Sequence, residues 1–186
     1  MIYILTGIAK AGKSYLTTRI IKEYAIGSFS SDYLMISLAL GNPELHLNPD
    51  ASDSTVSLQL RPYLMAMIQT MVENNIDYLI EGVHFQPEFS RELMEKFPNK
   101  VKILYLGYRL IDSRAKKEEL KLYGPASKNH WYKAMNDKEL THLVEYLKKE
   151  SERLYLDCQK YGLNYVEITN IAQQSDEIIH NLMGSK

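Results

Sequence analysis

Gly7-Ile8-Ala9-Lys10-Ala11-Gly12-Lys13-Ser14 is the stretch that decides the fold, because it fits the pattern G-x-x-x-x-G-K-[ST] at every fixed position. Residues 1–6 (MIYILT) form a short apolar run typical of a buried strand, and residues 15–26 carry apolar side chains at helical spacing. A strand, a loop and a helix in this order direct backbone N–H groups and the positive helix end at one point, which suits phosphate. A plain glycine-containing turn is the alternative interpretation.

The fixed positions of this phosphate loop each have a chemical reason. Gly7 and Gly12 allow backbone conformations that side chains disfavour, so that successive N–H groups can turn inward. Lys13 is expected to reach the β- and γ-phosphates of a nucleotide, and Ser14 to offer its hydroxyl to Mg²⁺. The predicted nucleotide contacts are Gly7, Ile8, Ala9, Lys10, Ala11, Gly12, Lys13, Ser14 and Tyr15.

The composition excludes several classes of protein. The chain has 186 residues, 22 basic and 23 acidic side chains and a formal net charge of −1, and we expect residues 1–186 to form one domain. Without a general basic field, neither nucleic acid nor an anionic membrane is an expected partner. A single cysteine, Cys158, cannot form an intramolecular disulfide, and no apolar run approaches transmembrane length, which favours a cytoplasmic location.

The rest of the chain alternates between predicted strands and helices. We expect strands at 27–32, 77–82, 101–107 and 164–169, and helices at 33–40, 55–74, 87–97, 109–123, 137–161 and 176–183. Pro62 predicts a kink or a restart in its helix, and Asp50 and Asp53 most simply cap the start of that helix. The alternation predicts a parallel sheet covered on both faces, with a ligand beyond the carboxyl ends of the strands.

Acidic residues and a histidine follow these strand ends. Asp32 is our candidate for a base that accepts the proton of a hydroxyl, and its alternative role is to cap the next helix. Glu81 could organise Mg²⁺, or it could pair with a backbone N–H group or an arginine. His84 could contact a substrate or be purely structural.

Three arginines are candidates for anion contacts. Arg61 could bind an anionic acceptor bidentately, or it could be a solvated surface residue. Residues 109–136 are predicted to form a lid, in which Arg109 or Arg114 folds over the phosphates and excludes water. The alternative is a solvated helix whose charges are balanced by nearby acids.

Four stretches together resemble small P-loop kinases: GIAKAGKS (7–14), SSD (30–32), LIEGVHFQP (79–87) and the arginine-bearing helix after the fourth strand. LIEGVHFQP is similar to the EGVH-x-x-P segment of 2-phosphoglycerate kinase-like proteins, and RPYL (61–64) is similar to the same group. The SSD placement resembles zeta-toxin-like and antibiotic-phosphotransferase-like kinases, in which a matching aspartate activates the acceptor hydroxyl.

The resemblance implies a P-loop NTPase fold, a three-layer α/β sandwich with a five-stranded parallel sheet in the order 2-3-1-4-5 and a helical lid. It implies Lys13 and Ser14 as the residues for ATP and Mg²⁺, Asp32 as the base, and Arg109 or Arg114 as lid cations. The implied activity is transfer of the γ-phosphoryl group of ATP to a hydroxyl of a small metabolite, an anionic one included.

Two other functions stay open at this point. A non-catalytic nucleotide sensor would use the same loop, with Asp32 and Glu81 reduced to caps and packing partners. A kinase directed at a nucleotide, a sugar or an antibiotic is the second alternative. The third strand ends in Glu-Gly-Val-His and not in Asp-Gly-x-Pro-Arg, and the chain has no Asn-Lys-x-Asp motif, which disfavours a nucleoside monophosphate acceptor and a GTPase.

Overall fold

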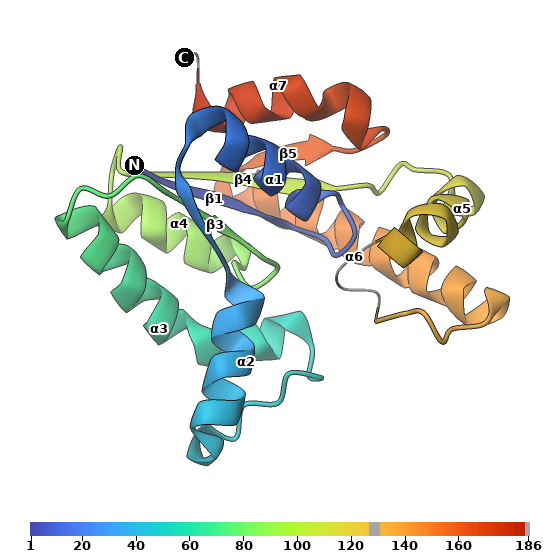
Figure 1. Cartoon of the computed structure of the whole chain (residues 1–186), viewed down its shortest axis with the longest axis horizontal. Helices are drawn as coiled ribbons and strands as arrows, with labels where there is room; N and C mark the ends of the chain where they lie inside the picture. The colour runs from blue at the N-terminus through green and yellow to red at the C-terminus, as the bar shows by residue number, and fades with distance from the viewer. Residues whose placement is uncertain (127–130, 185–186) are drawn as a thin grey trace.

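The computed structural model describes residues 1–126 and 131–184, and its centre is one sheet of five parallel strands. The strand order is β2-β3-β1-β4-β5, as predicted (Figure 1). The strands are β1 (Ile2–Gly7), β2 (Gly27–Ser30), β3 (Tyr78–Glu81), β4 (Val101–Gly107) and β5 (Asn164–Glu167). The helices are α1 (Lys13–Tyr24), α2 (Ser31–Gly41), α3 (Asp53–Glu73), α4 (Pro87–Lys96), α5 (Ser113–Tyr123), α6 (Asp137–Tyr161) and α7 (Ile171–Met183), with short 3₁₀ turns at Pro43–Leu45 and Gly124–Ala126.

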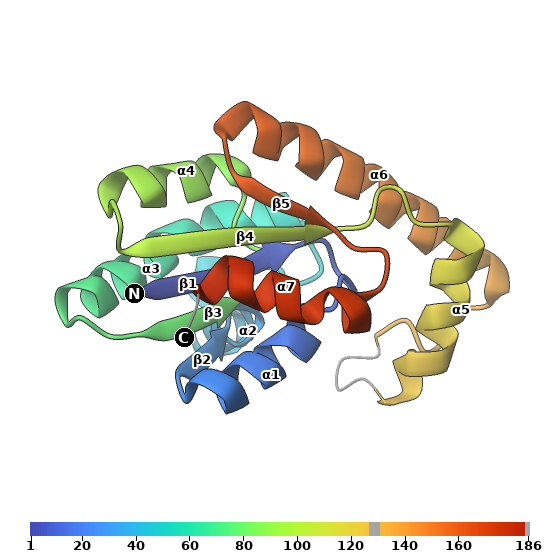
Figure 2. The same ribbon diagram turned by 90° about the horizontal axis from the view of Figure 1, so that it is seen from above.

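Helices cover both faces of the sheet, because the central strands are apolar on both sides. Successive residues of a strand point to opposite faces. Ile4 accordingly packs with the residues of α3, α4 and α6, whereas Leu5 packs with those of α1 and α7. Figure 2 shows α7 and α1 on one side of the strands and α4 and α6 on the other. The three-layer α/β sandwich that we predicted is confirmed.

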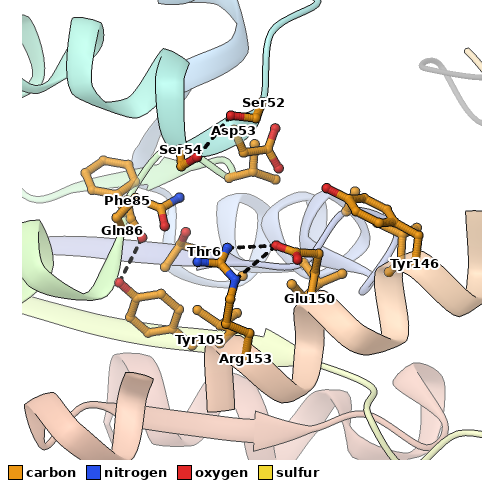
Figure 3. A pocket seen from close by; sticks show the side chains of 16 residues that line it. Thr6, Ser52, Asp53, Ser54, Phe85, Gln86, Tyr105, Tyr146, Glu150 and Arg153 are labelled. Atoms are coloured by element: carbon orange, nitrogen blue, oxygen red, sulfur yellow. Dashed lines mark hydrogen bonds and ion pairs between the residues drawn. The ribbon is translucent and has the colours of Figure 1, made fainter. Parts of the chain in front are cut away.

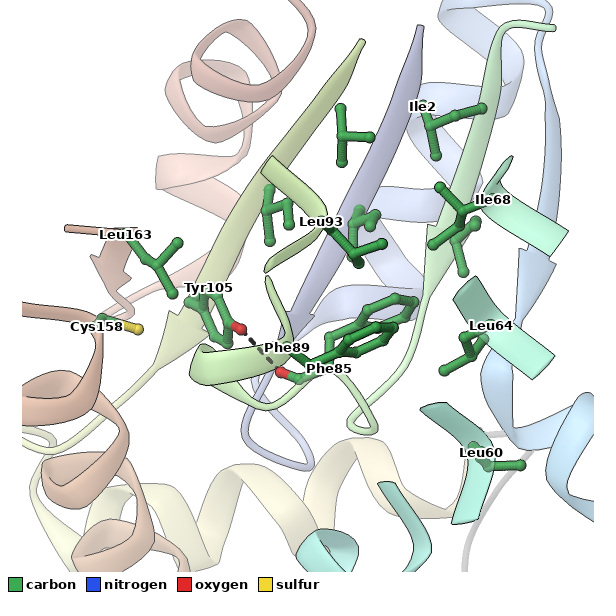
Figure 4. Close-up of a cluster of buried hydrophobic side chains, with 14 of the residues drawn as sticks. Ile2, Leu60, Leu64, Ile68, Phe85, Phe89, Leu93, Tyr105, Cys158 and Leu163 are labelled. Carbon is green, nitrogen blue, oxygen red and sulfur yellow. Dashed lines mark hydrogen bonds between the residues drawn. The ribbon is translucent and has the colours of Figure 1, made fainter. Parts of the chain in front are cut away.

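The core on the α3–α4–α6 face brings distant segments together beneath the carboxyl ends of the strands. Leu60 and Leu64 of α3 and Phe89 of α4 are buried there (Figure 4). The Tyr105 hydroxyl is also buried, and it donates to the carbonyl of Phe85 at 2.8 Å. These contacts hold the segment after β3 against β4, and so they fix the edge of the sheet where the predicted site lies.

Several predicted boundaries were wrong because capping residues start the helices elsewhere. The side chain of Asp112 accepts from the backbone N–H of Ala115, so α5 begins at Ser113 and Arg109 lies in the turn before it. Asn170 caps α7 in the same way, so α7 begins at Ile171, five residues before the start expected at 176. In α2 the cap is Ser30, so Asp32 lies in the first helical turn and is not the cap itself.

Helix α3 is continuous through Pro62, so the predicted restart of the helix is wrong. A proline removes the N–H that would bond the carbonyl four residues earlier. That carbonyl belongs to Leu58, a residue 68% exposed, where water can satisfy the oxygen. Among the described residues, no helix is both long enough and apolar enough to cross a membrane.

Candidate active site

The phosphate loop joins β1 to α1 and depends on two glycines with positive φ. Gly7 has φ 116° and Gly12 has φ 90°, a region that favours glycine. A Cβ at Gly7 would overlap the backbone carbonyl of Leu106 in β4, and a Cβ at Gly12 would meet the side chain of Ile171. The two glycines therefore serve both the loop conformation and its close packing.

The geometry of this loop fits a bound phosphate group. Helix α1 begins at Lys13, and within the described residues no side chain caps it, so its first N–H groups are available to an anion. Lys13 is 7% exposed, and its ammonium group donates to the carbonyls of Gly7 at 3.1 Å and Ile8 at 2.7 Å. Burial lowers the pKa of Lys13, whereas the carboxylates of Glu81, Asp32 and Asp53 oppose that shift.

Helix α5 of the predicted lid supports the loop through Lys116, a residue that the sequence analysis did not single out. Its ammonium group is 2% exposed and donates to the carbonyl of Lys10 at 2.9 Å. The same group lies 4.5 Å from the ring centroid of Tyr108, whose hydroxyl donates to the Ala9 carbonyl at 2.8 Å. The sequence feature that could have identified Lys116 is its position four residues before Leu120, because both residues are buried on one face of α5.

Residues 131–136 of the predicted lid also approach the loop. The Lys10 ammonium lies 4.9 Å from the ring centroid of Tyr132 and 5.9 Å from that of Trp131. Residues 127–130 of the predicted lid lie outside the described residues. The described part of the segment thus contacts the same loop residues as α5.

Asp32 and His84 lie together at the ends of β2 and β3. His84 is 2% exposed, and its Nδ1 is 2.8 Å from the Ser31 hydroxyl and 3.8 Å from an Asp32 carboxylate oxygen. Burial lowers the pKa of His84, while Asp32 raises it and Lys13 lowers it. The close approach also requires Gly82, where a Cβ would overlap the Ser31 side chain.

Metal-ligating groups are sparse at this edge. The described residues contain no group of three or more histidine, cysteine or acidic side chains placed to hold a metal ion. Ser14 is exposed at the start of α1, and Glu81 is half-buried at the end of β3, where its charge acts on Lys13. One hydroxyl and one nearby carboxylate fit Mg²⁺, which usually keeps several waters and takes its other oxygens from phosphates.

The three predicted arginines occupy different surroundings. Arg61 pairs with Glu92 at 2.6 Å and lies over the Phe89 ring, on the α3–α4 side. Arg109 lies 3.3 Å from Glu152, 3.4 Å from Glu167 and over the Tyr155 ring, so its guanidinium is turned toward α6 and β5. Arg114 is exposed on α5. The structure therefore does not bring the three guanidinium groups together.

A cleft opens beside the first residues of the phosphate loop. Its cavity volume is about 70 Å³, it is open to solvent, and it lies between the start of α3 and α6 (Figure 3). It is lined by Thr6, Gly7, Ile8, Ala9, Ser52, Asp53, Ser54, Val83, Phe85, Gln86, Tyr105, Tyr146, Leu147, Glu150, Arg153 and Leu154. Asp53 is a residue that we had interpreted as a helix cap; the cap is Ser52, which accepts from the Thr55 N–H, and Asp53 faces the cleft.

No family model matches the chain, and no curated protein matches its sequence. Solved structures do. The chain is similar to shikimate kinase from Bacteroides thetaiotaomicron, with 15% identity and a TM-score of 0.59 over 100% of this chain and 99% of that one. It is similar to a gluconokinase from Sinorhizobium meliloti 1021, with 14% identity and a TM-score of 0.57 over 98% and 89%.

A third similar structure is shikimate kinase from Acinetobacter baumannii in complex with shikimate, with 12% identity and a TM-score of 0.54 over 96% of this chain and 90% of that one. The TM-scores show that this chain shares the fold of these kinases, as the sequence predicted. At identities this low, the similarity shows the fold alone. The narrower resemblance to 2-phosphoglycerate kinase-like and zeta-toxin-like proteins is not confirmed by these similarities.

Proposed function

We propose that this chain is an ATP- and Mg²⁺-dependent kinase that phosphorylates a hydroxyl group of a small metabolite. The observation that carries the proposal is the placement of Asp32. Its carboxylate lies 3.8 Å from Nδ1 of the buried His84 and acts electrostatically on Lys13 of the phosphate loop, although the three residues come from separate segments. The similar structures support it, since two of the three are named shikimate kinases and the third a gluconokinase.

Each proposed role uses a contact of the described residues. Lys13 exchanges its two carbonyl partners for phosphate oxygens, while the uncapped N–H groups of α1 bind the same phosphates. Ser14, with Glu81 acting directly or through water, organises Mg²⁺. Bound ATP supplies the phosphoryl group, so that a bond from phosphorus to the acceptor oxygen forms as the bond to ADP breaks, and the acceptor proton passes to Asp32. His84 lies beside Asp32 and contacts the Ser31 hydroxyl through its Nδ1.

The lid cations are part of the same proposal. Arg114 is exposed on α5, the helix whose Lys116 contacts the loop, so a movement of α5 is required to bring Arg114 over the phosphates. Arg109 would first have to leave Glu152 and Glu167. Arg114 is therefore the preferred candidate of the two.

Two measurements test this function against a nucleotide sensor. Mg²⁺·ATP should raise the melting temperature of the protein, because a ligand of the native state stabilises it by mass action. A panel of hydroxylated metabolites, with shikimate and gluconate included, should then give acceptor-dependent ADP release. Stabilisation without ADP release for any acceptor would favour the sensor, and the absence of an ATP effect would contradict both.

Asp32→Asn sharpens the test. Because the variant keeps shape but loses the base, turnover should fall about 100- to 10,000-fold while stabilisation by ATP is retained. Asp50→Asn, at an exposed position in the turn before α3, is the matched control. Full turnover in the Asp32 variant would contradict the role of Asp32 as the base.

A further inference from the structure

Thr6 points to a ligand in the cleft beside the phosphate loop. Its side chain is 0% exposed, and its hydroxyl has no hydrogen-bond partner in the described part of the chain. An unpaired buried hydroxyl costs stability, so such groups are rare unless a partner is missing. Thr6 lines the cleft and lies immediately before Gly7 (Figure 3). A group bound there would be both next to the loop and within reach of this hydroxyl.

The cleft offers mainly uncharged hydrogen-bonding groups. Ser52, Ser54 and Gln86 line it together with the exposed phenol ring of Tyr146. Hydroxyl and amide groups can both donate and accept, which matches the hydroxyl groups of a ligand. The ring of Tyr146 adds a flat apolar surface against which the C–H face of a sugar or cyclitol can pack.

The charged groups of the cleft oppose an acidic ligand. Among the described lining residues the charged side chains are Asp53, Glu150 and Arg153, and Arg153 pairs with Glu150 at 2.7 Å. That pairing leaves Asp53 as the carboxylate of the lining without a lining arginine as partner. The carboxylates of Asp53, Asp32 and Glu81 all act electrostatically on Lys13. Nucleotide phosphates would engage Lys13 and so remove the balancing cation.

The arginines that could have bound an acid are engaged outside this lining. Arg61 pairs with Glu92, and Arg109 pairs with Glu152 and Glu167. Neither belongs to the described residues that line the cleft. A carboxylate or phosphate on the acceptor would therefore meet carboxylates of the same sign, and it would have to displace Glu150 to pair with Arg153, the one guanidinium among the described lining residues.

We propose that this cleft binds the phosphoryl acceptor, and that the acceptor is a polyhydroxylated compound without an acidic group. The inference rests on the proposed kinase function and narrows its substrate class. Asp53 and Glu150 accept hydrogen bonds from acceptor hydroxyls, and the Thr6 hydroxyl forms a further hydrogen bond with the acceptor. The anionic acceptor that Arg61 suggested in the sequence is disfavoured by the negative charge of the cleft.

The test compares ligands that differ in one acidic group. Binding to the full-length protein is measured by calorimetry in the presence of Mg²⁺ and a non-hydrolysable ATP analogue, and turnover is measured by ADP release. The probes are glucitol with gluconate, and glucose with glucosamine and glucuronate. We expect the uncharged or amino compound of each set to exceed its acid at least about tenfold in affinity and in kcat/KM. A preference for glucosamine over glucose supports the inference and narrows it to amino compounds.

Variants connect the preference to the cleft. Thr6→Val removes the unpaired hydroxyl at constant shape, so it should weaken polyol binding about 3- to 10-fold without lowering the melting temperature. Asp53→Asn and Glu150→Gln should reduce the ratio of polyol to acid affinity while leaving stabilisation by ATP intact. Glu145→Gln, exposed on α6 and outside the lining, is the control and should keep the ratio of the wild type.

The outcomes separate this inference from the proposed function. Preferred binding or turnover of the acids overturns the inference and leaves a kinase. Binding of the ATP analogue with no binding of any probe also overturns it, because the cleft is then no polyol site. Failure of the protein to bind nucleotide overturns the proposed function, and the inference falls with it.

Discussion

The phosphate loop and the cleft meet at Thr6 and Gly7, but different parts of the chain build them. The loop presents backbone N–H groups and one buried lysine, all from consecutive residues packed against β4 and α7. The cleft is made of side chains from the ends of β1 and β3, the start of α3 and the middle of α6, and several of them are exposed. A backbone site tolerates few changes, whereas a side-chain site can change its ligand without loss of the fold.

Lys13→Ala should have the largest effect on function, since it removes the buried loop ammonium that we propose to bind the phosphates. We expect turnover to fall by about 100-fold or more, and the rise in melting temperature with Mg²⁺·ATP to disappear. Lys22→Ala, exposed on the same helix, is the control. If Mg²⁺·ATP raised the melting temperature of the Lys13 variant as much as that of the wild type, the loop would not be the nucleotide site that distinguishes it from the cleft.

Gly7→Ala tests whether the loop depends on the backbone. The added Cβ would overlap the Leu106 carbonyl at a φ of 116°, so we expect the free energy of unfolding in urea to fall by about 2–4 kcal/mol. Gly41→Ala is the matched control, because a Cβ there meets nothing within 4 Å. Equal stability of the two variants would show that the loop can rearrange around a side chain.

Lys116→Met tests whether α5 orders the loop. The variant keeps much of the buried stem but loses the hydrogen bond to the Lys10 carbonyl, and we expect a rise of about tenfold in the KM for ATP. Lys117→Met on the same helix, which loses an ion pair with Asp137 and a hydrogen bond to the Thr141 hydroxyl, is the comparison. Identical kinetics in the two variants would show that Lys116 only packs in the core and does not order the phosphate loop.

Arg61→Ala should have the smallest effect. The ion pair of Arg61 with Glu92 is partly exposed, and such pairs contribute about 0–1 kcal/mol to stability. We expect kcat/KM for the best uncharged acceptor to stay within about twofold, because the acceptor brings no charge for Arg61 to bind. A decrease of tenfold or more in kcat/KM would indicate that Arg61 contacts the acceptor and would favour an anionic acceptor.

The sequence predicted the layers and strand order of the fold, and it identified the stretch that forms the loop between β1 and α1. Boundaries failed where a cap decided them, as at Asp112 and Asn170, because several residues nearby could have capped equally well. The candidate acids were identified from their positions after strands, and the burial of His84 was not, because it depends on α3 and α2 together.

What the sequence determined by itself is the phosphate loop, since eight consecutive residues carry all the information that a backbone cradle needs. The alternation of strands and helices determined the sheet in the same local way. Tertiary structure alone decided that Asp53 faces the cleft, that Thr6 has no partner among the described residues, and that Arg61 and Arg109 are paired elsewhere. These properties depend on which side chains from distant segments meet, and neither burial nor the neutralisation of a charge is encoded by the spacing of neighbouring residues.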